Sequence, residues 1–120
     1  MKVCILGDGL TSLALAKAFV NKGIVVDILS NNSCKNKKDK IRTIGISKSN
    51  IDFLNKNILN IEKLIWDIDK IEIYSESHIN EKILSFDDNN QRLFSIVKNY
   101  KLKDYLLSNL NKNQLIKFKK

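Results

Sequence analysis

The sequence predicts one α/β domain over residues 1–120, with a parallel strand–helix–strand unit at its N-terminus. Val3–Leu6 is a continuous apolar run, as expected for a parallel strand buried on both faces, and Ile24–Ser30 is a second run, rich in β-branched residues. Between them, Leu10–Val20 has apolar residues at helical spacing, and Gly23 follows where a helix C-cap is expected. The three elements fit within about 30 residues, the length of one βαβ unit.

The rest of the chain is expected to add strands and helices to this unit. After a polar, basic loop at 31–40, Ser47 is a candidate N-cap, because a serine hydroxyl accepts a hydrogen bond from a free helix N–H. Trp66 is expected in the core. The expected elements are an extended segment at 41–47, helices at 48–59 and 100–110, a helical turn or two at 61–68, and strands at 70–77, 81–86, 93–99 and 114–120.

Composition limits the class of protein. Hydrophobic residues make up 43% of the chain, enough for a core, and no run approaches the ~20 apolar residues of a membrane-spanning helix. Cys4 and Cys34 are too few for a disulfide framework, so we expect free thiols in a reducing compartment. We find no histidine or cysteine cluster that predicts a metal site, and we expect the protein to be cytoplasmic.

The formal net charge of +8 raises the question of an anionic partner. Lysines gather in two segments, 35–40 and 98–120, and neither segment interleaves them with aromatic residues in a stacking pattern. The chain also has no helix-turn-helix or zinc-finger signature. We therefore expect solvated lysine surfaces and no nucleic-acid partner, with a nucleic-acid-binding surface as the alternative.

The turn after the first strand carries a glycine motif. Gly7 and Gly9 stand one residue apart, and Ser12 occupies the position of the third glycine in a G-x-G-x-x-G fingerprint. A tight turn needs Gly7, and the missing Cβ at Gly9 lets a pyrophosphate approach the backbone at the helix N-terminus. Serine is only one atom larger than the alanine that the third position accepts. The motif predicts a Rossmann-like dinucleotide-binding turn formed by Gly7, Gly9, Leu10, Thr11 and Ser12.

The end of the second predicted strand does not identify the nucleotide. An acidic residue there binds the ribose hydroxyls in dinucleotide sites of this kind, whereas this chain has Ser30, and Asp27 lies inside the strand. The lysines that follow at 35, 37 and 38 suit the 2′-phosphate of NADP. The residues alone thus leave FAD and NADP as alternatives.

Three segments together resemble a known family. They are GDGLTSLALAKAFVNKGIVVDIL at 7–29, RTIGIS at 42–47 and LFSIVKNYKLKDYLLSNL at 93–110. They resemble the flavin-dependent aromatic hydroxylases, in particular the 2-polyprenylphenol hydroxylases of ubiquinone biosynthesis. The resemblance implies that the glycine motif binds the FAD diphosphate, that Ser30 lies beside the cofactor, that Arg42 touches it and that Asn99 offers it an amide. Taken alone, Arg42 also fits a surface cation of the basic loop, and Asn99 a helix cap.

The resemblance also implies an activity, that of an FAD monooxygenase reduced by NAD(P)H that hydroxylates a polyprenylated phenol. Its partners would be this aromatic substrate and, peripherally, the inner membrane or a multienzyme complex. The family's later cofactor motifs have no counterpart here, so we expect the N-terminal part of an incomplete FAD-binding domain. His78 and Asp87-Asp88 fit loops, and no catalytic residue is assigned. The alternatives are an NAD(P)-binding oxidoreductase fragment and a non-catalytic basic module that binds nucleotides or nucleic acid.

Overall fold

The predicted βαβ unit forms the N-terminal part of the fold. The structure is a computed structural model, and it describes residues 1–30, 42–76, 81–87 and 94–119. Strand β1 (Lys2–Leu6) leads into helix α1 (Leu10–Asn21) and then into strand β2 (Val25–Leu29). β1 is parallel to β2, and β8 (Ile116–Lys119) is parallel to β2 on its other side, so the strand order is β1-β2-β8. Gly23 turns the chain after α1 with a φ of +75°, which favours glycine as the sequence predicts.

A second sheet follows, with one helix beside it. β3 (Thr43–Ser47) pairs antiparallel with β7 (Phe94–Lys98), and β4 (Ile65–Ile68) pairs antiparallel with the other edge of β7. α2 (Lys48–Asn57) begins directly after β3, where the Ser47 hydroxyl accepts a hydrogen bond from a first-turn backbone N–H at 3.4 Å. The predicted N-cap is therefore confirmed.

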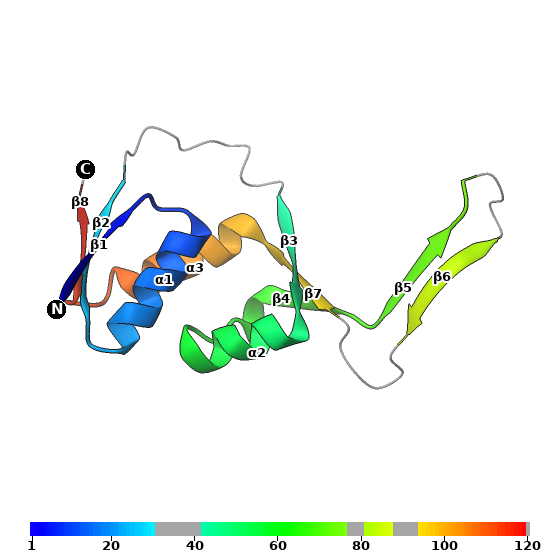
Figure 1. Ribbon diagram of the computed structural model, residues 1–120, viewed down its shortest axis with the longest axis horizontal. Coiled ribbons are helices and arrows are strands. Elements are labelled where there is room, and N and C mark those ends of the chain that lie inside the picture. Colours follow the sequence, from blue (N-terminus) through cyan, green and yellow to red (C-terminus); the bar gives the residue numbers. More distant parts are fainter. Residues whose placement is uncertain (31–41, 77–80, 88–93, 120) are drawn as a thin grey trace.

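Helix α3 (Asn99–Leu110) leads from β7 toward β8 and packs beside α1 (Figure 1). Leu102, Leu106 and Leu110 recur every four residues, lie on one helix face and are buried. The apolar faces of the helices and strands meet in one core. Its largest fully buried apolar side chains are Leu13, Val26, Ile28, Ile51, Ile61, Val97 and Leu110. None of the helices in the described residues has the length and apolarity to cross a membrane.

β5 (Lys70–Tyr74) and β6 (Lys82–Asp87) form an antiparallel hairpin that projects from the rest of the described chain (Figure 1). Ile73 lies opposite Leu84, and their side chains are 45% and 44% exposed. The Glu72 carboxylate forms ion pairs with the ammonium groups of Lys70 and Lys82, the first residues of β5 and β6, at N–O distances of 3.1 and 2.6 Å. Hydrogen bonds from these two lysines lower the pKa of Glu72 to about 2, and the bond from the lysine of β6 has the larger effect.

The structure corrects two expectations about strands. The first strand was expected to be buried on both faces, but Leu6 is 78% exposed, because nothing among the described residues covers that face or pairs with the outer edge of β1. Residues 61–68 were expected to be helical, but only Glu62–Leu64 forms a short 3₁₀ turn before the chain extends as β4. Hydrogen bonding to β7 supplies β4 with a partner that local spacing does not reveal.

Trp66 was expected in the core and instead lies on the outer face of β4. Its side chain is 48% exposed. The ammonium groups of Lys98 and Lys101 lie 5.6 and 5.8 Å from the ring centre, within the range of a cation–π contact. The side chain is thus held at the surface by two cations.

Candidate dinucleotide-binding site

Gly7 makes the turn between β1 and α1. Its φ is +94°, in the half of backbone space where an L side chain is strained. Its N–H donates a hydrogen bond to the Leu29 carbonyl at 2.7 Å, which fixes the turn against the end of β2. A Cβ built at Gly7 would lie 3.9 Å from the Ser12 hydroxyl oxygen, an ordinary contact. Backbone conformation, and not lack of space, therefore favours glycine here.

Gly9 is the N-cap residue of α1 and leaves the helix N-terminus open. Its φ of −68° and ψ of 168° suit any residue, and no atom lies within 4 Å of a Cβ built on it. No side chain caps the helix, and no acidic residue stands in its first turn. The N–H groups of Leu10, Thr11 and Ser12 lie in this first turn and have no intrahelical acceptor. Together with the helix dipole, they suit an anion that approaches through the open space at Gly9.

Asp8 places one carboxylate within the turn, and a lysine of α3 offsets its charge. The Lys103 ammonium lies 3.7 Å from the Asp8 carboxylate, and the two side chains are 28% and 43% exposed. The ion pair joins the glycine turn to α3. Sequence reasoning missed it, because the two residues are far apart along the chain and no motif links them.

Ser30 follows directly after β2, at the edge of the sheet where the Leu29 carbonyl accepts the hydrogen bond from Gly7. The Ser30 backbone N–H donates to the Lys119 carbonyl at 3.0 Å. The structure thus places Ser30 and the glycine turn at the same edge of the β1-β2-β8 sheet, as the βαβ pattern predicts.

Asp27 does not supply the acid that is missing at Ser30. Side chains alternate between the two faces of a strand, and Asp27 points away from the apolar face of β2 that packs in the core. Its carboxylate is almost fully buried and binds the ammonium groups of Lys119 at 2.6 Å and Lys2 at 2.9 Å. The hydrogen bond from Lys119, and then the one from Lys2, lower the pKa of Asp27. The carboxylate therefore ties β1, β2 and β8 together.

Arg42 and Asn99 are adjacent in the fold. The Asn99 N–H donates a hydrogen bond to the Arg42 carbonyl at 2.9 Å, where β3 and α3 begin. The Arg42 side chain is exposed. Asn99 is the first residue of α3, whose N-cap is Lys98 with no side-chain hydrogen bond to the helix. The cap role considered for Asn99 is therefore not observed.

The candidate residues lie at one end of two neighbouring helices. Figure 1 shows α1 and α3 side by side, with their N-terminal ends on the same side of the molecule. Neither helix has a side-chain cap or an acidic residue in its first turn. Arg42 lies beside the start of α3, because its backbone carbonyl accepts the hydrogen bond from Asn99, and Lys103 in the second turn of α3 offsets the negative charge of Asp8. A dinucleotide diphosphate, which needs many donors and cations, suits this arrangement.

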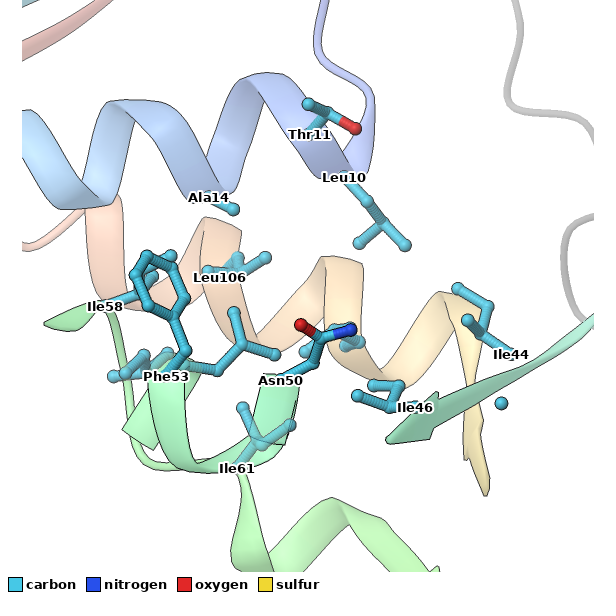
Figure 2. A pocket seen from close by; sticks show the side chains of 14 residues that line it. Leu10, Thr11, Ala14, Ile44, Ile46, Asn50, Phe53, Ile58, Ile61 and Leu106 are labelled. Atoms are coloured by element: carbon cyan, nitrogen blue, oxygen red, sulfur yellow. The ribbon is translucent and has the colours of Figure 1, made fainter. Parts of the chain in front are cut away.

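An apolar pocket of about 410 Å³ lies beside the glycine turn (Figure 2). Leu10 and Thr11 belong to both, and the other lining residues come from α1, β3, α2 with the segment after it, and α3. None of the lining residues is charged. Sequence reasoning predicted these helices but not the pocket between them, because a helical pattern does not show where packed elements leave a gap.

Among the residues that the structure describes, the remaining candidates add no chemical group to the site. Among the described residues, no cluster of three or more His, Cys, Asp or Glu side chains suits a metal ion. Cys4 is an exposed free thiol on β1. Asp87 ends β6, whereas Cys34, His78 and Asp88 lie outside the described residues.

No protein-family model matches the sequence, and no curated protein matches it. Solved structures do share the fold. The p-nitrophenol 4-monooxygenase of Pseudomonas putida has a TM-score of 0.78 at 16% identity, over 98% of this chain and 31% of its own. A probable FAD-dependent monooxygenase of Pseudomonas aeruginosa, pqsL, has a TM-score of 0.77 at 17% identity, over 98% of this chain and 32% of its own. HpxO of Klebsiella pneumoniae, in complex with FAD and uric acid, has a TM-score of 0.74 at 15% identity, over 98% of this chain and 30% of its own.

These likenesses establish the fold. The chain has the α/β architecture found in FAD-dependent monooxygenases, and the Rossmann-like βαβ unit with additional strands is confirmed. The chain spans about a third of the length of the solved structures that it matches.

Proposed function

We propose that this chain is the FAD-binding portion of a flavin-dependent monooxygenase. The single observation that carries the proposal is the turn at Gly7 and Gly9. It leads into an uncapped helix N-terminus with open space above it, within a fold shared with FAD-dependent monooxygenases over 98% of the chain. Bound FAD would supply the redox chemistry that activates oxygen.

In this proposal the residues of the chain bind and orient the cofactor. The first-turn N–H groups of α1 hold the diphosphate, and Gly9 lets it come close. Arg42 supplies a permanent cation with a planar set of donors, and Lys103 keeps the Asp8 carboxylate from repelling the phosphates. Ser30 and Asn99 contribute a hydroxyl and an amide.

The finer part of the proposal concerns the whole protein. We infer that it hydroxylates a polyprenylated phenol with NAD(P)H as reductant, supported by the sequence resemblance of segments 7–29, 42–47 and 93–110. Such a substrate is membrane-embedded, so peripheral association with the inner membrane belongs to the same proposal. Incubation of the whole protein with NADPH, oxygen and a short-chain polyprenylphenol tests it, and mass spectrometry should show a product heavier by one oxygen atom. NADPH oxidation without this product contradicts the proposed substrate.

The cofactor proposal has a direct test in residues 1–120. FAD titrated into the chain should bind weakly and saturably by calorimetry, without turnover, because the chain provides only part of the fold. Gly9→Val should weaken binding at least tenfold, since its side chain occupies the open approach, and should leave the fold intact, since the Gly9 backbone suits any residue. Leu15→Val, at an exposed position of the same helix, is the matched control and should bind as the natural chain does.

Competing nucleotides separate this function from its alternatives. NADPH that binds more tightly than FAD, and also loses affinity with Gly9→Val, would favour an NAD(P)-binding oxidoreductase, for which the serine at position 30 is the supporting observation. A basic nucleic-acid module would instead bind single-stranded DNA with an affinity that falls steeply with salt, and Gly9→Val would not affect it.

A further inference from the structure

Trp66 and two lysines form a cluster on the outer face of β4. Trp66 lies opposite Ile96 of β7, and residues two positions apart on a strand share a face, so Lys98 projects to the same side as the tryptophan. Lys101 follows in the first turn of α3. The two ammonium groups lie 5.6 and 5.8 Å from the centre of the Trp66 ring. We call these three side chains the ring–lysine cluster.

The two lysines have no anionic partner within the part of the chain that the structure describes. There the ammonium groups contact only the Trp66 ring, and the first turn of α3 contains no acidic residue. Lys98 and Lys101 are three positions apart, a spacing at which like charges on a helix repel. They also lie at the positive end of the helix dipole, which disfavours cations. An anion bound between the two lysines would offset both effects.

The Trp66 ring offers a planar apolar surface beside these cations. The side chain is 48% exposed. Nucleobases stack on tryptophan, and any base is accepted because every base has a π face. A lysine ammonium is carried on a flexible four-carbon stem, so it can turn from the ring to a phosphate while a base takes its place. The cluster therefore suits a ligand in which a planar ring is joined to an anionic group.

The size of the cluster favours one nucleotide over a strand of nucleic acid. Single-stranded nucleic acid binds along a basic groove in which successive bases stack on several aromatic rings. The ring–lysine cluster has one ring. The other exposed aromatic side chains among the described residues lie on α2, β5, β6 and β8, and they are Phe53, Tyr74, Phe86 and Phe118. One ring with two cations matches one base with one phosphate.

We propose that the ring–lysine cluster binds a nucleoside phosphate. The base stacks on Trp66, and the phosphate lies between the ammonium groups of Lys98 and Lys101. The site uses no contact with the glycine turn at Gly7 and Gly9, so it does not rest on the proposed cofactor or reaction.

Tryptophan fluorescence measures this binding directly, because Trp66 is the single tryptophan of the chain. AMP titrated into residues 1–120 at constant ionic strength should quench the fluorescence and reach saturation at one site. Adenosine lacks the phosphate and should bind about tenfold more weakly or worse, as expected when hydrogen bonds to a charged group are lost. Inorganic phosphate lacks the ring and should compete with AMP only at concentrations about tenfold or more above the AMP dissociation constant.

Variants locate the site. Lys98→Gln and Lys101→Gln should each weaken AMP binding about three- to tenfold. Lys112→Gln, which removes the same charge beyond the far end of α3, should change it less than about twofold. Trp66→Leu should weaken AMP binding about fivefold or more by calorimetry, because a base–ring stack is lost. If Trp66→Leu does not fold, the two lysine variants decide the question. Gly9→Val should leave the AMP signal unchanged, which separates this site from the proposed FAD site.

Any of four results overturns the proposal. The first is an AMP titration without saturable quenching. The second is adenosine that binds as tightly as AMP, which would show that the lysines do not hold a phosphate. The third is loss of the AMP signal in Gly9→Val, which would place the nucleotide at the glycine turn. The fourth is a single-stranded oligonucleotide that binds about a hundredfold or more tightly than AMP, which would identify a nucleic-acid strand as the ligand.

Discussion

Serine substitutions at the two glycines of the turn should change the free energy of unfolding in opposite directions. Gly7 has a φ of +94°, so a serine there strains the backbone by ~1–2 kcal/mol and destabilises the chain. Gly9 has the extended conformation of an N-cap, and nothing lies within 4 Å of a Cβ at that position. Serine at Gly9 restricts the unfolded chain, which stabilises by ~0.4–1 kcal/mol, and its hydroxyl can cap α1 for a few tenths more.

Urea denaturation followed by circular dichroism measures both effects. With a slope of about 1–3 kcal/mol per molar urea, the midpoint should fall by roughly 0.5–1 M for Gly7→Ser and rise by roughly 0.5 M for Gly9→Ser. The stabilised Gly9→Ser chain should nonetheless bind FAD more weakly, because its hydroxyl competes for the same N–H groups. Equal destabilisation by both substitutions would refute the described turn, and unchanged FAD affinity in Gly9→Ser would refute its role.

Other predictions concern charged residues. Asp27→Asn should lower the free energy of unfolding at neutral pH, because it removes the carboxylate that binds Lys119 and Lys2. The pKa of Asp27 in the folded chain lies below 3.8, so the natural chain should lose its advantage as the pH falls through that lower pKa. Acid unfolding curves of the two chains should therefore converge there. Glu72→Gln should speed amide hydrogen exchange in the β5–β6 hairpin, and the natural hairpin should lose the same protection between pH 4.5 and about 2. Arg42→Gln should weaken FAD binding about tenfold by calorimetry, while Lys22→Gln, which removes the same charge at the far end of α1, should change it less than twofold.

Much of the fold is predictable because local pattern and tertiary structure agree. Val25–Leu29 is an apolar, β-branched run and forms a strand, and Ser47 caps the helix that follows it. The prediction fails at Ile65–Ile68, where Leu64, Ile65 and Ile68 match helical spacing as well as a strand. Only the pairing with β7 decides between the two, and no local pattern shows that pairing. The wrong expectation that Trp66 lies in the core has the same origin, since the exposure of its side chain depends on which face of β4 packs inward.

The candidate site likewise has some features that the sequence predicts and others that it does not. The turn at Gly7 and Gly9 is predictable because the motif is local, with its strand, turn and helix contiguous in sequence. The ion pair between Asp8 and Lys103 is not, because it depends on α3 packing beside α1. The pocket is not predictable either, since its walls come from four elements whose separation is a property of the folded chain.

The pairing of β2 with β8 also bears on how quickly the chain folds. β1 and β2 are close in sequence, whereas the bond between Asp27 and Lys119 joins positions separated by 92. Closing so long a loop loses chain entropy before the new contacts stabilise it, and folding rates fall as the average sequence separation of contacts rises. Docking of β8 is therefore expected to come late, and the strand farthest along the chain should set the rate at which the first sheet is completed.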